Sequence, residues 1–256
     1  MSSSFSHHFN VQAVAAEGGP AQFGTNVLAD LVDGIDEYRH ELEQQRRSRS
    51  LGPGMLGAFL WVDDTELLRR IAEYPSACVV VSKQPRSPRS LEKLRKVADA
   101  VKEASGFPAR ALPHLEGLRL HEDGAAPVVG PGSASPDIQL PALRSLGYRK
   151  AGEHLVPILH TKMLLLGDSR LWLGSANGTK SSRRSLEFGL WTQDPGLMDA
   201  AQKFLAEVVA QSEELDPDSN TLTPDLIEPD YDDEEMWEAL TALTDDAPDE
   251  GHRDSE

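Results

Sequence analysis

Cysteine is nearly absent from this sequence, since Cys78 is the single one in 256 residues. An internal disulfide framework is therefore excluded, and the composition fits a reducing compartment. No apolar stretch has the length that a bilayer requires, and the first residues lack the basic and apolar regions of a signal peptide. These absences predict a cytoplasmic protein without a membrane span.

Metal ligands at characteristic spacings are also lacking. The eight histidines are scattered, and together with one cysteine they form no spaced ligand pairs of the kind that hold zinc. Asp63 and Asp64 are adjacent, but an apolar helical pattern follows them, so we expect Asp64 to cap that helix. The sequence predicts no metal site and no cofactor.

Basic residues are scarce near the C-terminus, and the formal net charge of the whole chain is −17. Residues 213–256 hold 18 acidic side chains and one basic side chain, which leaves 24 of each sign for residues 1–212. The overall charge therefore does not exclude a polyanionic partner for the body of the chain.

We interpret residues 213–256 as a largely disordered acidic tail, because they are rich in acidic residues and interrupted by prolines. Residues 236–243 within the tail have the pattern of one short amphipathic helix. That helix would dock a protein partner, or cover an active site by mimicking a polyanion. The alternative is a tail that only keeps the chain in solution.

The rest of the chain divides into three parts. Residues 1–24 are polar and glycine-rich and predict a disordered N-terminus. Residues 25–50 predict a helix and a linker, with the helix presenting one apolar stripe made of Val27, Leu28, Leu31, Val32, Ile35, Tyr38 and Leu42. Residues 51–212 contain strand, helix, strand and helix patterns in that order, which predicts an α/β domain with a parallel sheet and covering helices.

Apolar periodicity places the core faces of this domain. Residues 56–62 and 79–81 have strand character, and a helix is expected after each, with inward positions at Leu67, Leu68, Ile71, Leu91, Leu94, Val97, Ala98 and Val101. Asp194 and Pro195 predict the start of a further helix. That helix would turn six side chains onto the core, namely Leu197, Met198, Ala201, Phe204, Leu205 and Val208.

The side chains best suited to catalysis lie within residues 160–177. The apolar run 163–166 predicts a strand, the Gly167-Asp168 pair predicts a hairpin turn, and residues 171–173 predict the returning strand. Strand alternation places His160 and Lys162 on one face, and the hairpin brings Ser175 and Asn177 near them. An imidazole, an ammonium group, a hydroxyl and an amide would then converge, which is a phosphate-binding set that includes a nucleophile.

This combination resembles the phospholipase D superfamily, the HKD phosphodiesterases. The resemblance rests on His160-Thr-Lys162, on Gly174-Ser175-Ala-Asn177 and on Glu187, and it implies a phospholipase D-like lobe with a mixed, mostly parallel sheet flanked by helices. The aspartate of the family motif usually lies five residues after the lysine, where this chain has Gly167. Asp168 lies one place later, and we assign it no catalytic role.

The resemblance also implies a mechanism. His160 would attack phosphorus and form a phosphohistidine, while Glu187 would accept a hydrogen bond from the Nδ1 of His160. Lys162, Asn177 and Ser175 would hold the non-bridging oxygens as negative charge develops. A second histidine must protonate the leaving oxygen. The chain has a single His-x-Lys, which favours a homodimer with a shared active site.

Three functions are compatible with these residues. The first is metal-independent hydrolysis of nucleic-acid phosphodiesters, because the basic side chains of Lys180, Arg183 and Arg184 lie close to the motif and could contact phosphates. An exposed loop is an equally good interpretation of those cations. The second function is a phospholipase D-type lipid hydrolase. The third is a catalytically idle subunit that binds nucleic acid or a protein within a larger system.

Overall fold

The computed structural model describes a little over half of the chain. The described residues are 21–45, 54–82, 88–112, 114, 119–120, 128–129, 139–146 and 159–215. The acidic tail beyond residue 215 and most of the segment 113–158 lie outside this part of the chain, as do residues 1–20 and 46–53. The predictions made for those segments therefore stay predictions.

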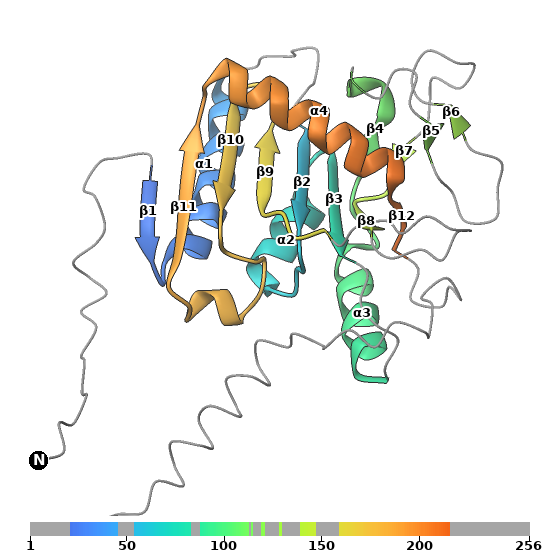
Figure 1. Cartoon of the computed structure of the whole chain (residues 1–256), viewed down its shortest axis with the longest axis horizontal. Coiled ribbons are helices and arrows are strands. Elements are labelled where there is room, and N and C mark those ends of the chain that lie inside the picture. Colours follow the sequence, from blue (N-terminus) through green and yellow to red (C-terminus); the bar gives the residue numbers. More distant parts are fainter. Residues whose placement is uncertain are drawn as a thin grey trace, which may run out of the picture.

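An eight-stranded sheet forms the centre of the fold (Figure 1). Its strands lie in the order β1 (Ala21–Gly24), β11 (Glu187–Thr192), β10 (Arg170–Gly174), β9 (Met163–Leu166), β2 (Met55–Phe59), β3 (Ala77–Ser82), β8 (Leu143–Leu146) and β12 (Glu213–Glu214). Two small antiparallel pairs lie apart from it, β4 (Phe107–Pro108) with β7 (Gln139–Leu140), and β5 (Arg119–Leu120) with β6 (Val128–Val129).

The sheet is mixed, as predicted, but parallel pairing is confined to its middle. β2 pairs with β3 and β3 with β8 in parallel, whereas the other neighbours are antiparallel. The expectation of a mostly parallel sheet therefore holds only for this central part. For β9 and β10 the reason is their three-residue connection, because a turn that short can join only antiparallel strands.

Helices cover both faces of the sheet, and the core is correspondingly divided in two. α1 (Val27–Gln45), α2 (Thr65–Glu73) and α3 (Pro88–Val101) lie on one side, and α4 (Pro195–Gln211) crosses the other side in front (Figure 1). Successive side chains of a strand point to opposite faces of the sheet. Leu164 and Leu166 therefore pack in the core under α1 and α2, whereas Leu165 packs in the core under α4. The α/β class with flanking helices is confirmed.

In the N-terminal part of the chain, the predicted helix is present, but the residues just before it differ from the prediction. The stripe of α1 is buried from Val27 to Tyr38, and Leu42 packs against the same core. Residues 21–24, which we expected to be disordered, form β1 at the edge of the sheet and pair with β11. A strand of four residues is too short to show apolar periodicity, and its neighbour β11 supplies the hydrogen bonds.

The core face of α4 is narrower than predicted. Met198, Ala201, Leu205 and Val208 are buried, but Leu197 and Phe204 are 46% and 42% exposed, so their assignment to the core was wrong. The two exposed residues are seven positions apart and therefore lie on the same flank of the helix. None of the described helices is long and apolar enough to cross a membrane.

A close contact between α1 and β11 yields a stability prediction. A Cβ atom at Gly34 would lie 2.5 Å from Cζ2 of Trp191, so Gly34→Ala must displace a partly buried indole. We expect a loss of about 1–2 kcal/mol in the free energy of unfolding, because the overpacking exceeds the helix-propensity gain of about 1 kcal/mol. Urea denaturation measures the change.

Gly196→Ala is the matched control, since a Cβ there meets only a side-chain oxygen of Asp194 at 3.3 Å. This variant should be neutral or slightly stabilised. A Gly34→Ala protein as stable as the wild type would show that the helix and strand separate without loss.

Candidate active site

Four strand ends meet at one edge of the sheet, the lower edge in Figure 1. β2 and β10 end there, and β9 and β11 begin there, as the register shows: Met163 lies opposite both Ala58 and Leu173, and Gly174 lies opposite Gly189. This is the edge at the carboxyl ends of the parallel strands, where α/β proteins commonly bind ligands. The predicted site residues lie on or beside these strand ends.

The hairpin that joins β9 and β10 has the turn predicted from the sequence. Gly167 adopts a φ of 58°, in the left-handed region that favours glycine, and its N–H donates to the carbonyl of Gly54 at 2.7 Å. Asp168 is exposed in this turn, at the opposite end of β9 from Lys162. The decision to give Asp168 no catalytic role is therefore consistent with its position.

His160 and Lys162 are together at the beginning of β9. The Nζ of Lys162 lies 3.2 Å from Nδ1 and 3.3 Å from Nε2 of His160, so the ammonium group lies against the imidazole ring. His160 is exposed and Lys162 half-buried. The ladder reaches one residue beyond β9, because the N–H of Gly174 donates to the carbonyl of Lys162 at 3.2 Å. Backbone pairing thus holds the lysine in register with the end of β10.

Glu187 contacts Ser175 instead of His160. The hydroxyl of Ser175 donates to Oε2 of Glu187, and it accepts the N–H of Phe188 at 2.9 Å. The N–H of Ser175 also donates to the carbonyl of Phe188 at 2.9 Å. The predicted hydrogen bond from His160 to Glu187 is thus absent from these described residues, because the strand register places Ser175 beside the start of β11.

A pair of glycines explains how β10 and β11 approach each other here. Gly174 and Gly189 are register partners, and a Cβ on either would lie within 2.8 Å of the Trp172 side chain. Their small size lets the indole lie across both strands. Trp172 is 1% exposed and stacks on Phe59 with ring centroids 6.1 Å apart, so it belongs to the core.

The loop after Ser175 is fixed through Gly178. Its carbonyl accepts the N–H groups of Asp63 and Asp64, both at 2.9 Å, and its own N–H donates to the carbonyl of Trp61 at 3.1 Å. Asn177, just before it, has a buried Oδ1 that lacks a hydrogen-bond partner within the described part of the chain. Because a buried amide oxygen without a partner is costly, this atom is available to a donor on a ligand or on another group of the site.

The three cations predicted to bind substrate have different environments. Arg183 forms a bidentate pair with Asp64, with nitrogen–oxygen distances of 2.5 and 2.8 Å, and its contact with a substrate stays a prediction. The side chains of Lys180 and Arg184 are exposed, while the N–H of Lys180 donates to Oδ1 of Asp63 at 3.0 Å. Lys180 and Arg184 therefore remain candidates for phosphate contacts.

Asp64 caps α2, as predicted, and also holds the loop. Its Oδ1 accepts the N–H groups of Glu66 and Leu67 at 3.1 and 3.0 Å, while Arg183 binds both carboxylate oxygens. Burial alone would raise the pKa of Asp64, but the hydrogen bonds from Arg183 and the helix outweigh it, and the pKa lies below its ordinary value of 3.8. The capping role was visible in the sequence, whereas the partnership with Arg183, 119 positions away, was not.

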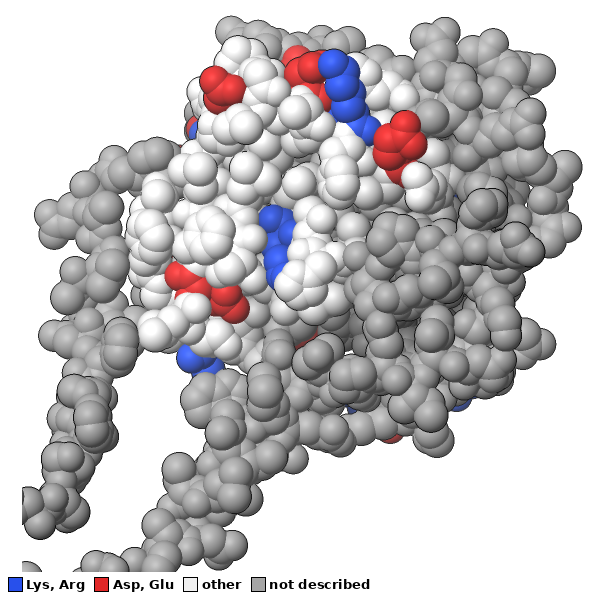
Figure 2. All heavy atoms as spheres, in the orientation of Figure 1, with Lys and Arg blue, Asp and Glu red and all other residues white. Residues whose placement is uncertain are grey.

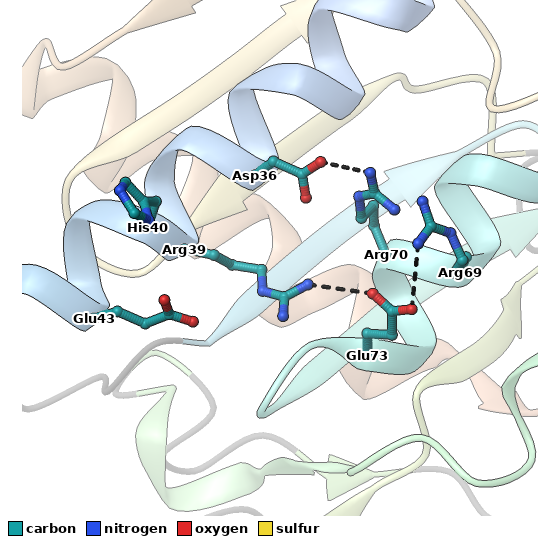
Figure 3. Close-up of a pocket in the computed structure, with 7 residues that line it drawn as sticks. All are labelled: Asp36, Arg39, His40, Glu43, Arg69, Arg70 and Glu73. Carbon is teal, nitrogen blue, oxygen red and sulfur yellow. Dashed lines mark hydrogen bonds and ion pairs between the residues drawn. The ribbon is translucent and has the colours of Figure 1, made fainter.

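A separate shallow cavity of about 270 Å³ lies between α1 and α2 (Figure 3). Three arginines line it, but Arg70 pairs with Asp36 at 2.5 Å, and Arg39 and Arg69 each lie 3.5 Å from Glu73. Because each guanidinium has a carboxylate partner, the cavity lacks the unbalanced positive charge that a phosphate site needs.

Comparison with known proteins gave similarities at the level of structure. No family model matches the sequence, and no curated protein matches it. Two solved structures resemble the fold, NucT from Helicobacter pylori with a TM-score of 0.41 and Nuc from Salmonella typhimurium, a phospholipase D family member, with a TM-score of 0.42. Each is 12% identical, and the similarity covers 75% of this chain and 95% of the other.

The Asp64–Arg183 pair yields a second prediction. Asp64→Asn keeps a good helix cap but loses the ion pair, and we expect a loss of about 1–2 kcal/mol in the free energy of unfolding at pH 7. This is below the 3–5 kcal/mol typical of fully buried pairs, because Arg183 is one-third exposed and solvent screens it.

The pH dependence of the same variant tests the cause. A lowered pKa means that the charge of Asp64 stabilises the fold above pH 3.8 and that this contribution disappears as the pH falls further. The difference between the wild type and Asp64→Asn should therefore be constant near neutrality and shrink below pH 3.8. A difference that grows on acidification would contradict the assignment.

Proposed function

We propose that this chain is a phosphodiesterase of the phospholipase D superfamily that hydrolyses nucleic-acid phosphodiesters. The observation that carries the proposal is the contact between the His160 ring and the Lys162 ammonium group at the strand-end edge. The contact supports the proposal, because an imidazole can attack phosphorus and a neighbouring cation can stabilise the charge that develops. Ser175 and Asn177 lie just after the end of β10, at the same edge of the sheet.

The chemistry has two steps. In the first, an imidazole nitrogen of His160 attacks phosphorus, so that an N–P bond forms and the P–O bond to the leaving group breaks. A second histidine protonates the leaving oxygen. In the second, that histidine removes a proton from water, the resulting hydroxide attacks phosphorus, and the N–P bond breaks to release the phosphate monoester. Lys162 stabilises the non-bridging oxygens in both steps. No step requires a metal ion.

Glu187 acts through Ser175 in this scheme. A carboxylate that accepts from the Ser175 hydroxyl fixes that hydroxyl, which in turn accepts from the N–H of Phe188. The arrangement holds the beginning of the 175–184 loop rigid, and it leaves Asn177 to donate to a phosphate oxygen. Glu187 is then a positioning residue.

Exposed cations favour nucleic acid as the substrate. Lys180 and Arg184 present exposed side chains from the loop that follows Asn177, where they would contact phosphates on either side of the cleaved bond. A phospholipid is the second candidate, and it is favoured by exposed aromatic side chains at Phe23 and Phe188 on the neighbouring strands. Parallel assays with oligonucleotides and phospholipid vesicles, both in the presence of EDTA, distinguish the two.

Removal of the nucleophile gives the third prediction. His160→Ala should lower kcat/KM by at least about a thousandfold on the true substrate, and Lys162→Ala by about a hundredfold or more. His40→Ala is the control, since His40 is a histidine on α1 whose ring bonds Gln44. Acid-labile phosphate on the wild type, absent from His160→Ala, identifies the intermediate. Wild-type turnover by His160→Ala would exclude the mechanism.

The fourth prediction concerns assembly, because one chain supplies one His-x-Lys. We propose a homodimer in which His160 of the partner subunit protonates the leaving group, and two-fold dimers are the commonest oligomers. Dimers that combine one wild-type copy with one His160→Ala copy, purified through two affinity tags, should be inactive or stall as the phosphohistidine. Half of the wild-type activity in such dimers would contradict a shared site.

A further inference from the structure

An apolar row lies uncovered beside the candidate active site. It consists of Phe23 on β1, Phe188 on β11 and Leu186 just before β11, which are 47%, 46% and 57% exposed. Phe23 and Phe188 are register partners in adjacent antiparallel strands and therefore share a face. None of the described helices covers the lower ends of β1 and β11 on the face towards the viewer (Figure 1).

The apolar row is continuous with the catalytic edge. Ser175 occupies the next position across the sheet, since its N–H donates to the carbonyl of Phe188 at 2.9 Å. Figure 2 views this face, and the described surface over β10 and β11 is mostly uncharged, with isolated basic and acidic side chains. A segment lying along the row would therefore place any flanking charges next to the site.

The chain itself contains a segment that fits both features. Residues 230–247 are the longest proline-free stretch of the acidic tail. Met236, Trp237, Leu240 and Leu243 have the i, i+1, i+4 and i+7 spacing of one helical face, with acidic residues at positions 232–235, 238, 245 and 246. Its apolar face could pack against the apolar row. Its carboxylates are opposite in charge to Lys162 and to the exposed Lys180 and Arg184.

The length of the chain permits this contact. The last described residue, Leu215, follows β12 at the far edge of the sheet from β1. An eight-stranded sheet is about 34 Å wide at the usual strand spacing. The 21 residues from Leu215 to Met236 span up to about 70 Å when extended. A tethered segment also has a high effective concentration at any surface within its reach.

We propose that residues 232–246 bind the apolar row of their own chain and place carboxylates at the His160–Lys162 edge. The segment then acts as a competitive, intramolecular mimic of a polyanionic substrate. This inhibitory consequence rests on the proposed function, whereas the docking itself does not. A substrate displaces the segment when its phosphates bind the same cations, and salt weakens the ionic part of the contact.

Photo-crosslinking of the full chain tests the docking without reference to catalysis. A benzoylphenylalanine at position 237, in place of the tryptophan, should cross-link to peptides that contain Phe23 or residues 186–188, in a band of monomer mass. The same probe at Leu226 is the control and should not label the row. Labelling elsewhere on the chain would overturn the proposal, and labelling only in bands of dimer mass would show that the row binds a second copy.

Matched variants define the surface. Phe23→Ser with Phe188→Ser should reduce the cross-link yield by about tenfold, the loss expected from removing two apolar contacts. Leu197→Ser with Phe204→Ser removes two equally exposed apolar side chains from α4 and should leave the yield unchanged. Equal effects of the two double variants would overturn the assignment of the docking surface to the apolar row.

Binding of a labelled oligonucleotide tests the regulation. In a His160→Ala background, which prevents cleavage, Trp237→Ser with Leu240→Ser should tighten binding severalfold at low salt, and the gain should shrink as salt rises. A specific cross-link together with unchanged oligonucleotide affinity would contradict the proposed inhibition, while the proposed docking would still be supported. Absence of oligonucleotide binding by every form would instead contradict the proposed function.

Discussion

The buried carboxylate of Asp64 connects the helical layer to the edge of the sheet that carries the candidate site residues. It accepts hydrogen bonds from two N–H groups at the start of α2 and from two guanidinium nitrogens of Arg183, which lies in the 175–184 loop. Backbone bonds from Asp63 and Asp64 to the carbonyl of Gly178 fix the same loop from the other side. The loop that carries Asn177 is thus held by a charge that would be unstable in the interior without these partners, so the position of the site depends on the pairing.

In the mixed sheet, the strands that form the buried core differ from the strands that carry most of the candidate site residues. The central strands β2 and β3 are buried between α4 and the other helices, and they have no exposed residue. The antiparallel strands β9, β10 and β11 continue the sheet, and their ends bring the candidate site residues to one edge. The glycine partners Gly174 and Gly189 let Trp172 fill the space beneath that edge. A rigid apolar layer therefore supports the polar residues, as a preorganised site requires.

Sequence periodicity was sufficient for most of the fold but not for its margins. The α1 stripe, the α2 face and the β9–β10 hairpin were predicted because each has a strong local pattern. β1 was missed because four edge residues show no such pattern, and Leu197 and Phe204 were placed in the core because periodicity does not give the width of a buried face. Local patterns predict which elements form, whereas tertiary packing decides which flank is covered.

The candidate site shows the same limit at the level of single residues. The contact between His160 and Lys162 follows from their spacing and was predicted, but the partners of Glu187 and Arg183 depend on register and on residues more than ten positions away. β11 illustrates why, because Gly189 and Trp191 pack towards α1 while Phe188 faces the uncovered side. The exposed pair Phe23 and Phe188 forms an apolar patch beside the candidate site residues, and patches of this kind commonly mark interaction surfaces. The alternation that anchors β11 in the core therefore also presents an apolar surface beside the candidate site.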